Sequence, residues 1–188
     1  PTPLAQSASM FNEQLLAHIV LKHASADEQL SLLEGNLMET NQTIVDIYSR
    51  YLFETEVIDT RADHAMNVDE LKDAMLRAQE ASYGDGLDPE IRHPYMWACK
   101  SHYYSSGYNF YNFPYAFGEL FAKGVFAQYL QKGAAFVPDY CRLLRSCGSG
   151  TIADVAASVG IDVRNPDFWR SSLEVVKGNI DKFCELVK

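Results

Sequence analysis

Apolar residues recur at helical spacing through almost the whole chain, and this pattern limits the folds that the chain can adopt. Short β-branched pieces occur, but none alternates apolar and polar residues over more than four positions, as a half-buried strand would. The sequence also lacks internal repeats and low-complexity tracts. We therefore expect an all-α, multi-helical fold, formed as a single helical domain over residues 1–188.

Helix boundaries are predicted from capping residues and breakers. Asp27 is a candidate N-cap, and Asn67–Glu70 (NVDE) has the pattern of a capping box. Pro114 suits a first helical turn, Thr151 suits an N-cap, and Gly133 ends a helix. The predicted helices cover residues 4–23, 27–59, 67–83, 94–104, 114–132, 136–146, 151–158 and 166–186.

The balance of charged residues argues against a nucleic-acid partner. The chain has 16 Lys and Arg against 25 Asp and Glu, a formal net charge of -9, whereas phosphate binding needs clustered basic residues. No run approaches the roughly 18 apolar residues of a membrane helix, and no secretory signal opens the chain. The 4 cysteines have no C-x-x-C spacing. They are expected to be free thiols in a reducing cytoplasm.

Motifs for several common catalytic sites are absent from the sequence. A zinc peptidase of the HExxH type needs two histidines at i and i+4, but none of the 5 histidines forms such a pair. His18 and His23, the nearest two, are separated by five positions. Neither a G-x-S-x-G nucleophile elbow nor a phosphate-binding loop occurs.

The first turn of the opening helix is polar, although the helix is apolar further along. Gln6, Ser9, Met10 and Glu13 fall at i, i+3, i+4 and i+7, so they share one helix face. One explanation is a first turn exposed to water, and the other is a face that points into a functional site. Periodicity alone favours neither explanation.

Aromatic residues concentrate between Tyr95 and Tyr140, most densely in the stretch HYYSSGYNFYNFPYAFG at 102–118. Tyrosine hydroxyls and the imidazole of His102 could line a groove and donate hydrogen bonds to a developing oxyanion. Gly107 would let the backbone approach a ligand closely. The alternative is an aromatic core under a loop, which is the commoner role for phenylalanine.

Three segments in the same order resemble the oligoendopeptidase F family of thimet-oligopeptidase-like zinc peptidases. Ala8–Glu13 (ASMFNE) resembles the family pattern A-S-x-F-N-E. His102–Tyr129 resembles its H-F-Y … F-Y-N-[FY]-P-Y-x-F-G-x-L-F-A-x-G-x-x-A-x-Y stretch. Gly160–Trp169 resembles its closing G-I-D-[IV]-x-x-x-x-F-W. The match covers nearly all 188 residues, so it is more specific than one short motif.

The resemblance implies an all-helical C-terminal lobe that lines a deep peptide channel and follows the zinc-binding HExxH helix. In the family, that helix supplies two His ligands and a general-base Glu. A further Glu, two residues before A-S-x-F-N-E, supplies the third ligand. Gln6 stands at that position here, and a neutral amide is a poorer zinc ligand than a carboxylate. His102 best matches the substrate-contacting histidine, and Tyr108, Tyr111 and Tyr115 are candidates for the catalytic tyrosines.

The resemblance therefore implies the C-terminal portion of a zinc metallo-oligopeptidase that hydrolyses short peptides. Zinc belongs to the intact family enzyme. Because this sequence has no HExxH and carries Gln6, the 188 residues alone are expected to hold no zinc and to be inactive. The expected partners are short peptides and either the missing N-terminal part or a second copy of the chain.

The alternative is a non-catalytic peptide-binding or scaffold domain derived from the same family. The opening residues contain no initiator Met and enter a helix at once, which is typical of a fragment. A truncated chain, an engineered Glu-to-Gln change and a natural degenerate copy all fit the sequence. Whether the chain as given is an enzyme therefore stays open.

Overall fold

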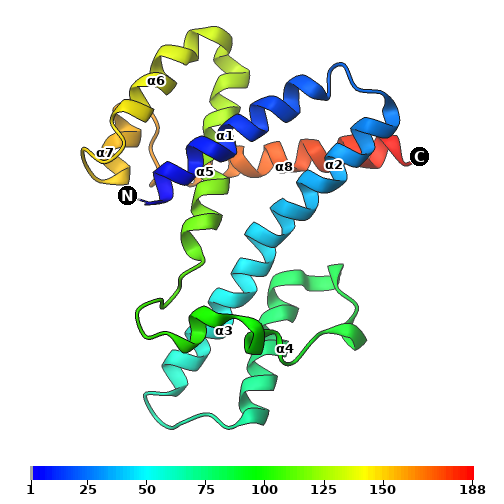
Figure 1. Cartoon of the computed structure of the whole chain (residues 1–188), viewed down its shortest axis with the longest axis vertical. Helices are drawn as coiled ribbons and strands as arrows, with labels where there is room; N and C mark the ends of the chain where they lie inside the picture. Colours follow the sequence, from blue (N-terminus) through cyan, green and yellow to red (C-terminus); the bar gives the residue numbers. More distant parts are fainter. Residues whose placement is uncertain (1) are drawn as a thin grey trace. The chain divides into compact units, whose positions relative to one another are not determined.

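The computed structural model describes residues 2–188, with side chains from residue 7 onward. Within this range the regular structure is helical and contains no strand, which confirms the predicted all-α fold (Figure 1). The α-helices are α1 (Thr2–Val20), α2 (Ala26–Asn41), α3 (Ile47–Thr60), α4 (Val68–Tyr83), α5 (Phe113–Lys132), α6 (Val137–Arg145), α7 (Ile152–Ala157) and α8 (Pro166–Leu186). None of the helices within residues 2–188 is both long and apolar enough to cross a membrane.

The chain divides into two compact units, which we call unit 1 and unit 2. Unit 1 comprises residues 1–40 and 117–188, and unit 2 comprises residues 41–116. Each unit has a cluster of buried apolar residues of its own. The expectation of a single domain over residues 1–188 stays a prediction, because compactness does not reveal whether the units fold together.

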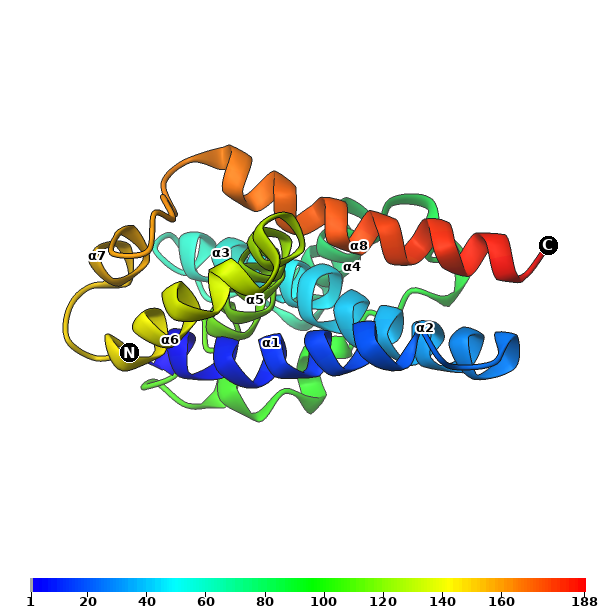
Figure 2. The same cartoon turned by 90° about the horizontal axis from the view of Figure 1, so that it is seen from above.

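The core of unit 1 is apolar and forms around α5. Phe121 and Phe126 of α5 are almost fully buried. Phe11 of α1 packs edge-on against Phe126, with 6.2 Å between ring centroids, and stacks on Tyr140 of α6 at 4.2 Å. These rings join α1 and α6 to α5, and the three helices lie close together when seen from above (Figure 2). The other large members are Phe136, Leu143, Val155, Val159, Ile161 and Phe168.

Helix α8 packs closely against α5 at Gly124. A Cβ atom added there would lie 2.5 Å from Cζ of Phe168 and 2.8 Å from Oγ of Ser172. Both of those residues belong to α8, and both are buried. Gly124 therefore permits an approach between the two helices that any larger residue would block.

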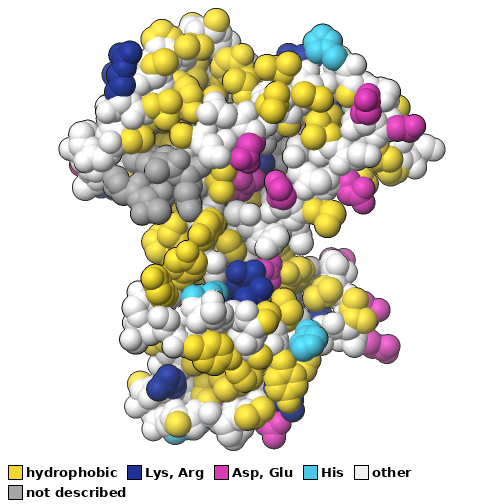
Figure 3. Space-filling model, viewed as in Figure 1, with side chains coloured by type: hydrophobic (Ala, Val, Ile, Leu, Met, Phe, Trp, Pro, Cys, Tyr) yellow, Lys and Arg dark blue, Asp and Glu magenta, His cyan; other side chains and the backbone are white. Residues whose placement is uncertain are grey.

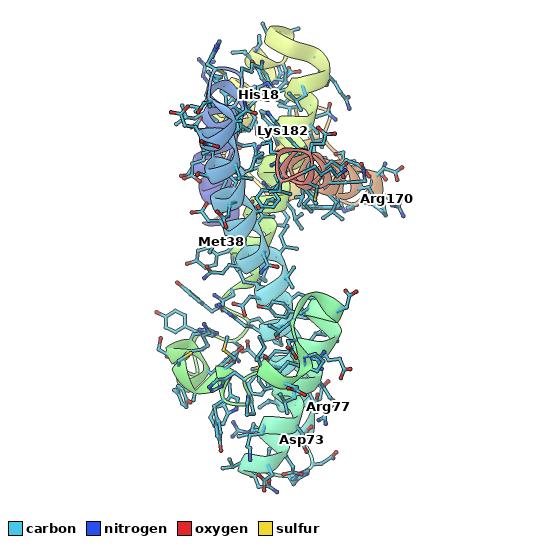
Figure 4. The ribbon with its side chains drawn as sticks, turned by 90° about the vertical axis from the view of Figure 1, so that its right-hand side faces the viewer. His18, Met38, Asp73, Arg77, Arg170 and Lys182 are labelled. Atoms are coloured by element: carbon cyan, nitrogen blue, oxygen red, sulfur yellow. The ribbon has the colours of Figure 1, made fainter. Side chains whose placement is uncertain are left out.

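Unit 2 has a smaller apolar core between α3 and α4. Phe53 of α3 is buried together with Ala74, Met75 and Ala78 of α4. The ring of Tyr103 packs against Phe53, with 5.5 Å between centroids. The exposed part of α4 is charged, as the labelled Asp73 and Arg77 show one turn apart in Figure 4. α4 is thus an amphipathic helix with one face buried against α3.

Most predicted helix ends are observed with their expected caps. The Asn67 side chain accepts hydrogen bonds from two backbone N–H groups of α4, and its own N–H donates to Glu70, which completes the capping box. The Thr151 hydroxyl accepts the N–H of Asp154, and Gly133 takes a positive φ of 60° after α5. The Asp27 cap is wrong. Ser25 caps α2 instead, because its hydroxyl accepts the N–H of Glu28 at 3.5 Å while its own N–H donates to the Glu28 carboxylate at 2.8 Å.

The predicted helix over 27–59 contains an irregularity that periodicity did not indicate. A π-helical turn, η1 (Gln42–Asp46), separates α2 from α3 without any break in the helical backbone. Such turns are rare in helices and are frequent near functional sites. The turn places Asp46 one helical turn before Arg50, with which it forms an ion pair.

The predicted helix over 94–104 is wrong in type. Two 3-10 turns, η4 (Met96–Cys99) and η5 (Ser101–Tyr104), stand there, separated by extended backbone at Lys100 with φ -99° and ψ 94°. The indole N–H of Trp97 donates to the carbonyl of Pro94 at 3.0 Å, and the N–H of Lys100 donates to the carbonyl of Trp97. These short-range bonds give the backbone carbonyls of Pro94 and Trp97 hydrogen-bond partners without an α-helix.

Candidate functional site

The opening turn of α1 is only partly described. Gln6 lies within α1, but its side chain lies outside the described residues, so its role as a family ligand position stays a prediction. On the same face, the Ser9 hydroxyl donates to Oε1 of Glu13 at 3.1 Å. Ser9 and Glu13 of this polar face are therefore hydrogen-bonded to each other within α1.

A polar pocket of about 290 Å³ in unit 1 lies beside that helix face. It contains Lys123, which is only 4% exposed. The ammonium of Lys123 donates to Oε1 of Gln14 at 3.0 Å and pairs with Glu119 at 3.0 Å, and the Thr40 hydroxyl donates to Glu119 at 3.1 Å. The sequence did not reveal this network, because Lys123 and Gln14 are 109 positions apart. The pocket is lined by Met10, Glu13, Gln14, Asn36, Glu39, Thr40, Glu119 and Lys123.

The described side chains do not provide a zinc site. Among residues 7–188, no three His, Cys, Asp or Glu side chains come together in a way that could hold a metal ion. Protein zinc sites need three or four such ligands. A zinc ion in a peptidase of the resembling type would therefore need ligands beyond the side chains described here.

Unit 2 brings the four predicted site residues His102, Tyr108, Tyr111 and Tyr115 into one series of ring contacts, which we call the tyrosine cluster. The ring of Tyr111 lies 5.8 Å from His102, 5.4 Å from Tyr108 and 5.9 Å from Tyr115, measured between centroids. The hydroxyls of Tyr111 and Tyr115 are 3.1 Å apart and share a hydrogen bond. Tyr108 is 54% exposed and Tyr111 is 42% exposed, so this part of the cluster faces solvent and is not an aromatic core.

The surroundings shift the pKa values of two members of the cluster, His102 and Tyr111. Burial lowers the pKa of His102, and the positive charges of Arg50 and Lys100 lower it further. The hydrogen bond with Tyr115 raises the pKa of Tyr111. At neutral pH the imidazole is therefore uncharged and the phenol is protonated. His102 Nε2 is buried and has no hydrogen-bond partner among the described residues. Neutral N–H and O–H groups of this kind can donate to a carbonyl oxygen or an oxyanion.

An ion pair between Arg50 and Asp46 lies close to the cluster, and the sequence motifs did not single it out. Each side chain is 13% exposed. The Tyr83 hydroxyl donates to Asp46 at 3.3 Å, and burial raises the pKa of Tyr83 to about 12. The spacing of Asp46 and Arg50 at i and i+4 is a signal that could have revealed the pair. In Figure 3, the surface over unit 2 shows basic and histidine side chains among hydrophobic ones.

The loop between His102 and α5 obtains its unusual backbone from a residue other than the predicted one. Gly107 was expected to supply conformational freedom, but it is not among the glycines with positive φ. Phe110 takes φ 53° instead, as the one non-glycine residue of the described range with positive φ. The unusual backbone conformation therefore lies at Phe110, between Tyr108 and Tyr111 in the chain.

Comparisons with known proteins agree with the resemblance seen in the sequence, although no protein-family model matches the chain. The chain is 23% identical to oligopeptidase PepF of Bacillus subtilis (strain 168), over 98% of this chain and 27% of that protein. It is 24% identical to the chromosomal oligoendopeptidase F of Lactococcus lactis subsp. cremoris, over all of this chain and 31% of that protein.

A solved structure shows the same fold. The crystal structure of oligoendopeptidase-F from Enterococcus faecium matches 98% of this chain and 35% of its own, with a TM-score of 0.82 and 21% sequence identity. The chain thus spans about a third or less of the length of the relatives that it matches. The resemblance to oligoendopeptidase F, over a part of such a protein, is confirmed.

Proposed function

We propose that the chain is the C-terminal, peptide-contacting part of an oligoendopeptidase F-type zinc peptidase. Its tyrosine cluster would hold the backbone of a short peptide. The observation that carries this proposal is the series of ring contacts from His102 through Tyr111 to Tyr115. The similarity to oligoendopeptidases over the whole chain supports it, because hydrolysis of short peptides is the activity that those names imply.

The hydroxyl pair explains how the cluster would act on a peptide. When one of the hydroxyls of Tyr111 and Tyr115 donates to the other, the acceptor keeps its own O–H group free to donate. That group and the neutral imidazole of His102 would donate to peptide carbonyls and stabilise negative charge that develops on one of them. Metal-activated water would be the contribution of zinc in the whole enzyme, and we assign no such step to the described side chains. The 188 residues alone are expected to be inactive.

Binding of a fluorescently labelled, unstructured peptide tests the proposal. We expect a Kd in the micromolar range, about -8 kcal/mol, measured by fluorescence anisotropy without added metal. Loss of one hydrogen bond in Tyr111→Phe should weaken binding by about 3- to 10-fold, and His102→Ala by at least as much. Tyr48→Phe is a matched control, because Tyr48 is also in unit 2 and is 50% exposed but lies outside the cluster.

The outcomes separate the candidate functions. Absence of binding, or an equal effect of Tyr111→Phe and Tyr48→Phe, would contradict a role for the cluster in peptide contact. Cleavage of the peptide by the 188 residues would contradict the expected inactivity. Specific binding, combined with no cleavage by any longer natural chain that contains these residues, would favour the non-catalytic peptide-binding alternative.

Unit 1 also exposes apolar side chains that suit a protein partner. Leu16, Ile19 and Val20 of α1 are 61%, 48% and 42% exposed. We expect the remainder of a longer enzyme, or a second copy of this chain, to cover such surface. Sedimentation velocity should show self-association of the isolated chain. A monomer that binds no hydrophobic dye would contradict this expectation.

A further inference from the structure

The loop that carries Tyr108 and Tyr111 is attached to α3 through one buried carboxylate. Glu54 is only 9% exposed, and its Oε1 accepts the backbone N–H of Phe110 at 2.8 Å. The two residues are 56 positions apart, so the bond is a tertiary contact within unit 2. A hydrogen bond to a charged acceptor is among the stronger ones in proteins.

Glu54 bonds to the loop at Phe110, the one non-glycine residue with positive φ in the described range. A φ of 53° brings the Cβ of an L-residue close to its own backbone, and phenylalanine has no polar side chain to compensate for this locally. Such a conformation persists when surrounding contacts fix it. Two contacts from α3 do so, namely the carboxylate of Glu54 and the ring of Tyr51, whose centroid is 5.4 Å from that of Phe110.

The turn at Phe110 lies between two members of the tyrosine cluster. Tyr108 and Tyr111 flank it in the chain, and their rings meet edge to face at 5.4 Å. Tyr111 in turn reaches Tyr115 through the hydroxyl pair. We propose that Glu54 is a positioning residue, which holds the loop in the conformation that assembles the tyrosine cluster. That Glu54 thereby assists peptide binding rests on the proposed function, whereas its role in holding the loop does not.

The negative charge of Glu54 is not expected to stabilise the folded state. Burial raises the pKa of this carboxyl, and the hydrogen bond from Phe110 opposes that rise only in part. Arg50, one turn earlier on α3, is already paired with Asp46. A buried carboxylate without an ion-pair partner is unfavourable compared with an apolar side chain of similar size. The group that gains from its presence is the Phe110 amide.

Hydrogen exchange at the Phe110 amide, followed by NMR, tests the proposal directly. Glu54→Leu keeps the volume and removes the acceptor, and it should lower the protection of this amide about 10-fold. Glu54→Gln keeps an acceptor oxygen and should restore most of the protection. Glu56→Gln is the matched control, because Glu56 lies on α3 but pairs with Arg77 on the surface. It should leave the Phe110 amide unchanged.

The hydroxyl pair provides a second readout that loss of stability alone would not move. In Glu54→Leu, the pKa of Tyr111, measured from its ring carbon shift, should fall toward the ordinary tyrosine value as the bond to Tyr115 is lost. Glu54→Gln should keep the raised pKa. Amides of the buried α4 residues Ala74 and Ala78 report whether each variant is folded.

The two proposals fail in different ways. Unchanged protection at Phe110 in Glu54→Leu, or a Glu54→Gln variant no better protected than Glu54→Leu, would overturn the positioning role whatever the peptide affinity. If the wild-type chain binds no peptide while Phe110 still depends on Glu54, the positioning role stands and the proposed function fails. If both hold, peptide affinity should fall in Glu54→Leu and recover in Glu54→Gln.

Discussion

Unit 1 and unit 2 differ in the size of their apolar cores, although each of them also holds a nearly buried ion pair. Unit 1 is built around the rings of Phe11, Phe121 and Phe126, with apolar neighbours from five helices. Unit 2 has the smaller apolar core. Its ion pair joins Arg50 and Asp46, and that of unit 1 joins Lys123 and Glu119. Unit 2 differs further in the buried carboxylate of Glu54, which accepts the backbone N–H of Phe110. The units therefore differ in core size and in this carboxylate, and not in the presence of buried charge.

Each unit contains one of the two tryptophans of the chain, so the comparison can be measured. Trp169 of unit 1 packs against Phe117 and donates to the carbonyl of Val163 at 2.8 Å. Trp97 of unit 2 packs against the core of that unit. Variants that keep only one tryptophan, Trp97→Phe or Trp169→Phe, would report the unfolding of each unit separately.

The largest expected effect is the loss of a core ring in unit 1. Phe126→Ala should lower the free energy of unfolding by about 4 kcal/mol, because it removes a fully buried ring and leaves a cavity. Urea unfolding followed at Trp169 measures this loss. Phe53→Ala is the counterpart in unit 2 and should act mainly on the Trp97 signal. If both probes shift together in both variants, the units unfold as one and the single-domain prediction gains support.

A smaller loss of stability is expected from replacing Lys123, the one buried lysine among the described residues of unit 1. Lys123→Met leaves the Glu119 carboxylate without its ion-pair partner and should destabilise unit 1 by about 3 kcal/mol. The double variant Lys123→Met with Glu119→Leu removes both charges and should recover much of that loss. A double variant less stable than Lys123→Met would show that Glu119 contributes through Thr40 and not through the ion pair.

The smallest expected effect concerns pH and unit 2. Burial raises the pKa of Glu54 above its ordinary value of 4.5, so folding takes up a proton between that value and the folded pKa. The stability of unit 2 should therefore rise as the pH falls through this window, and should gain nothing more from Glu54 below 4.5. Glu54→Gln should remove this contribution, as seen from the urea midpoint at Trp97. An unchanged pH dependence would contradict burial of an ionisable Glu54.

Local features of the fold could be predicted from the sequence because their partners are close in the chain. The capping box at Asn67, the Thr151 cap and the Gly133 terminus each join residues within one helical turn. The 3-10 turns between 96 and 104 were missed, because side-chain bonds such as that from Trp97 to Pro94 compete with helix formation and leave no trace in periodicity.

The candidate site was only partly visible in the sequence. His102, Tyr108, Tyr111 and Tyr115 stand in one stretch, so the family motif alone selects them together. The motif does not reveal that Tyr111 is the central ring of the series or that its hydroxyl meets that of Tyr115. The residue with positive φ in this loop is Phe110, whereas the sequence analysis placed the conformational freedom at Gly107.

The sequence by itself determined an all-helical chain, most of its helix ends and the resemblance to part of an oligoendopeptidase F. These properties follow from periodicity, caps and ordered motifs, which short stretches of chain contain completely. Only the tertiary structure decided which distant groups meet: Glu54 with the amide of Phe110, and Lys123 with Gln14 and Glu119. Buried polar groups require partners wherever the fold provides them, and the fold brings together residues that are far apart in the chain.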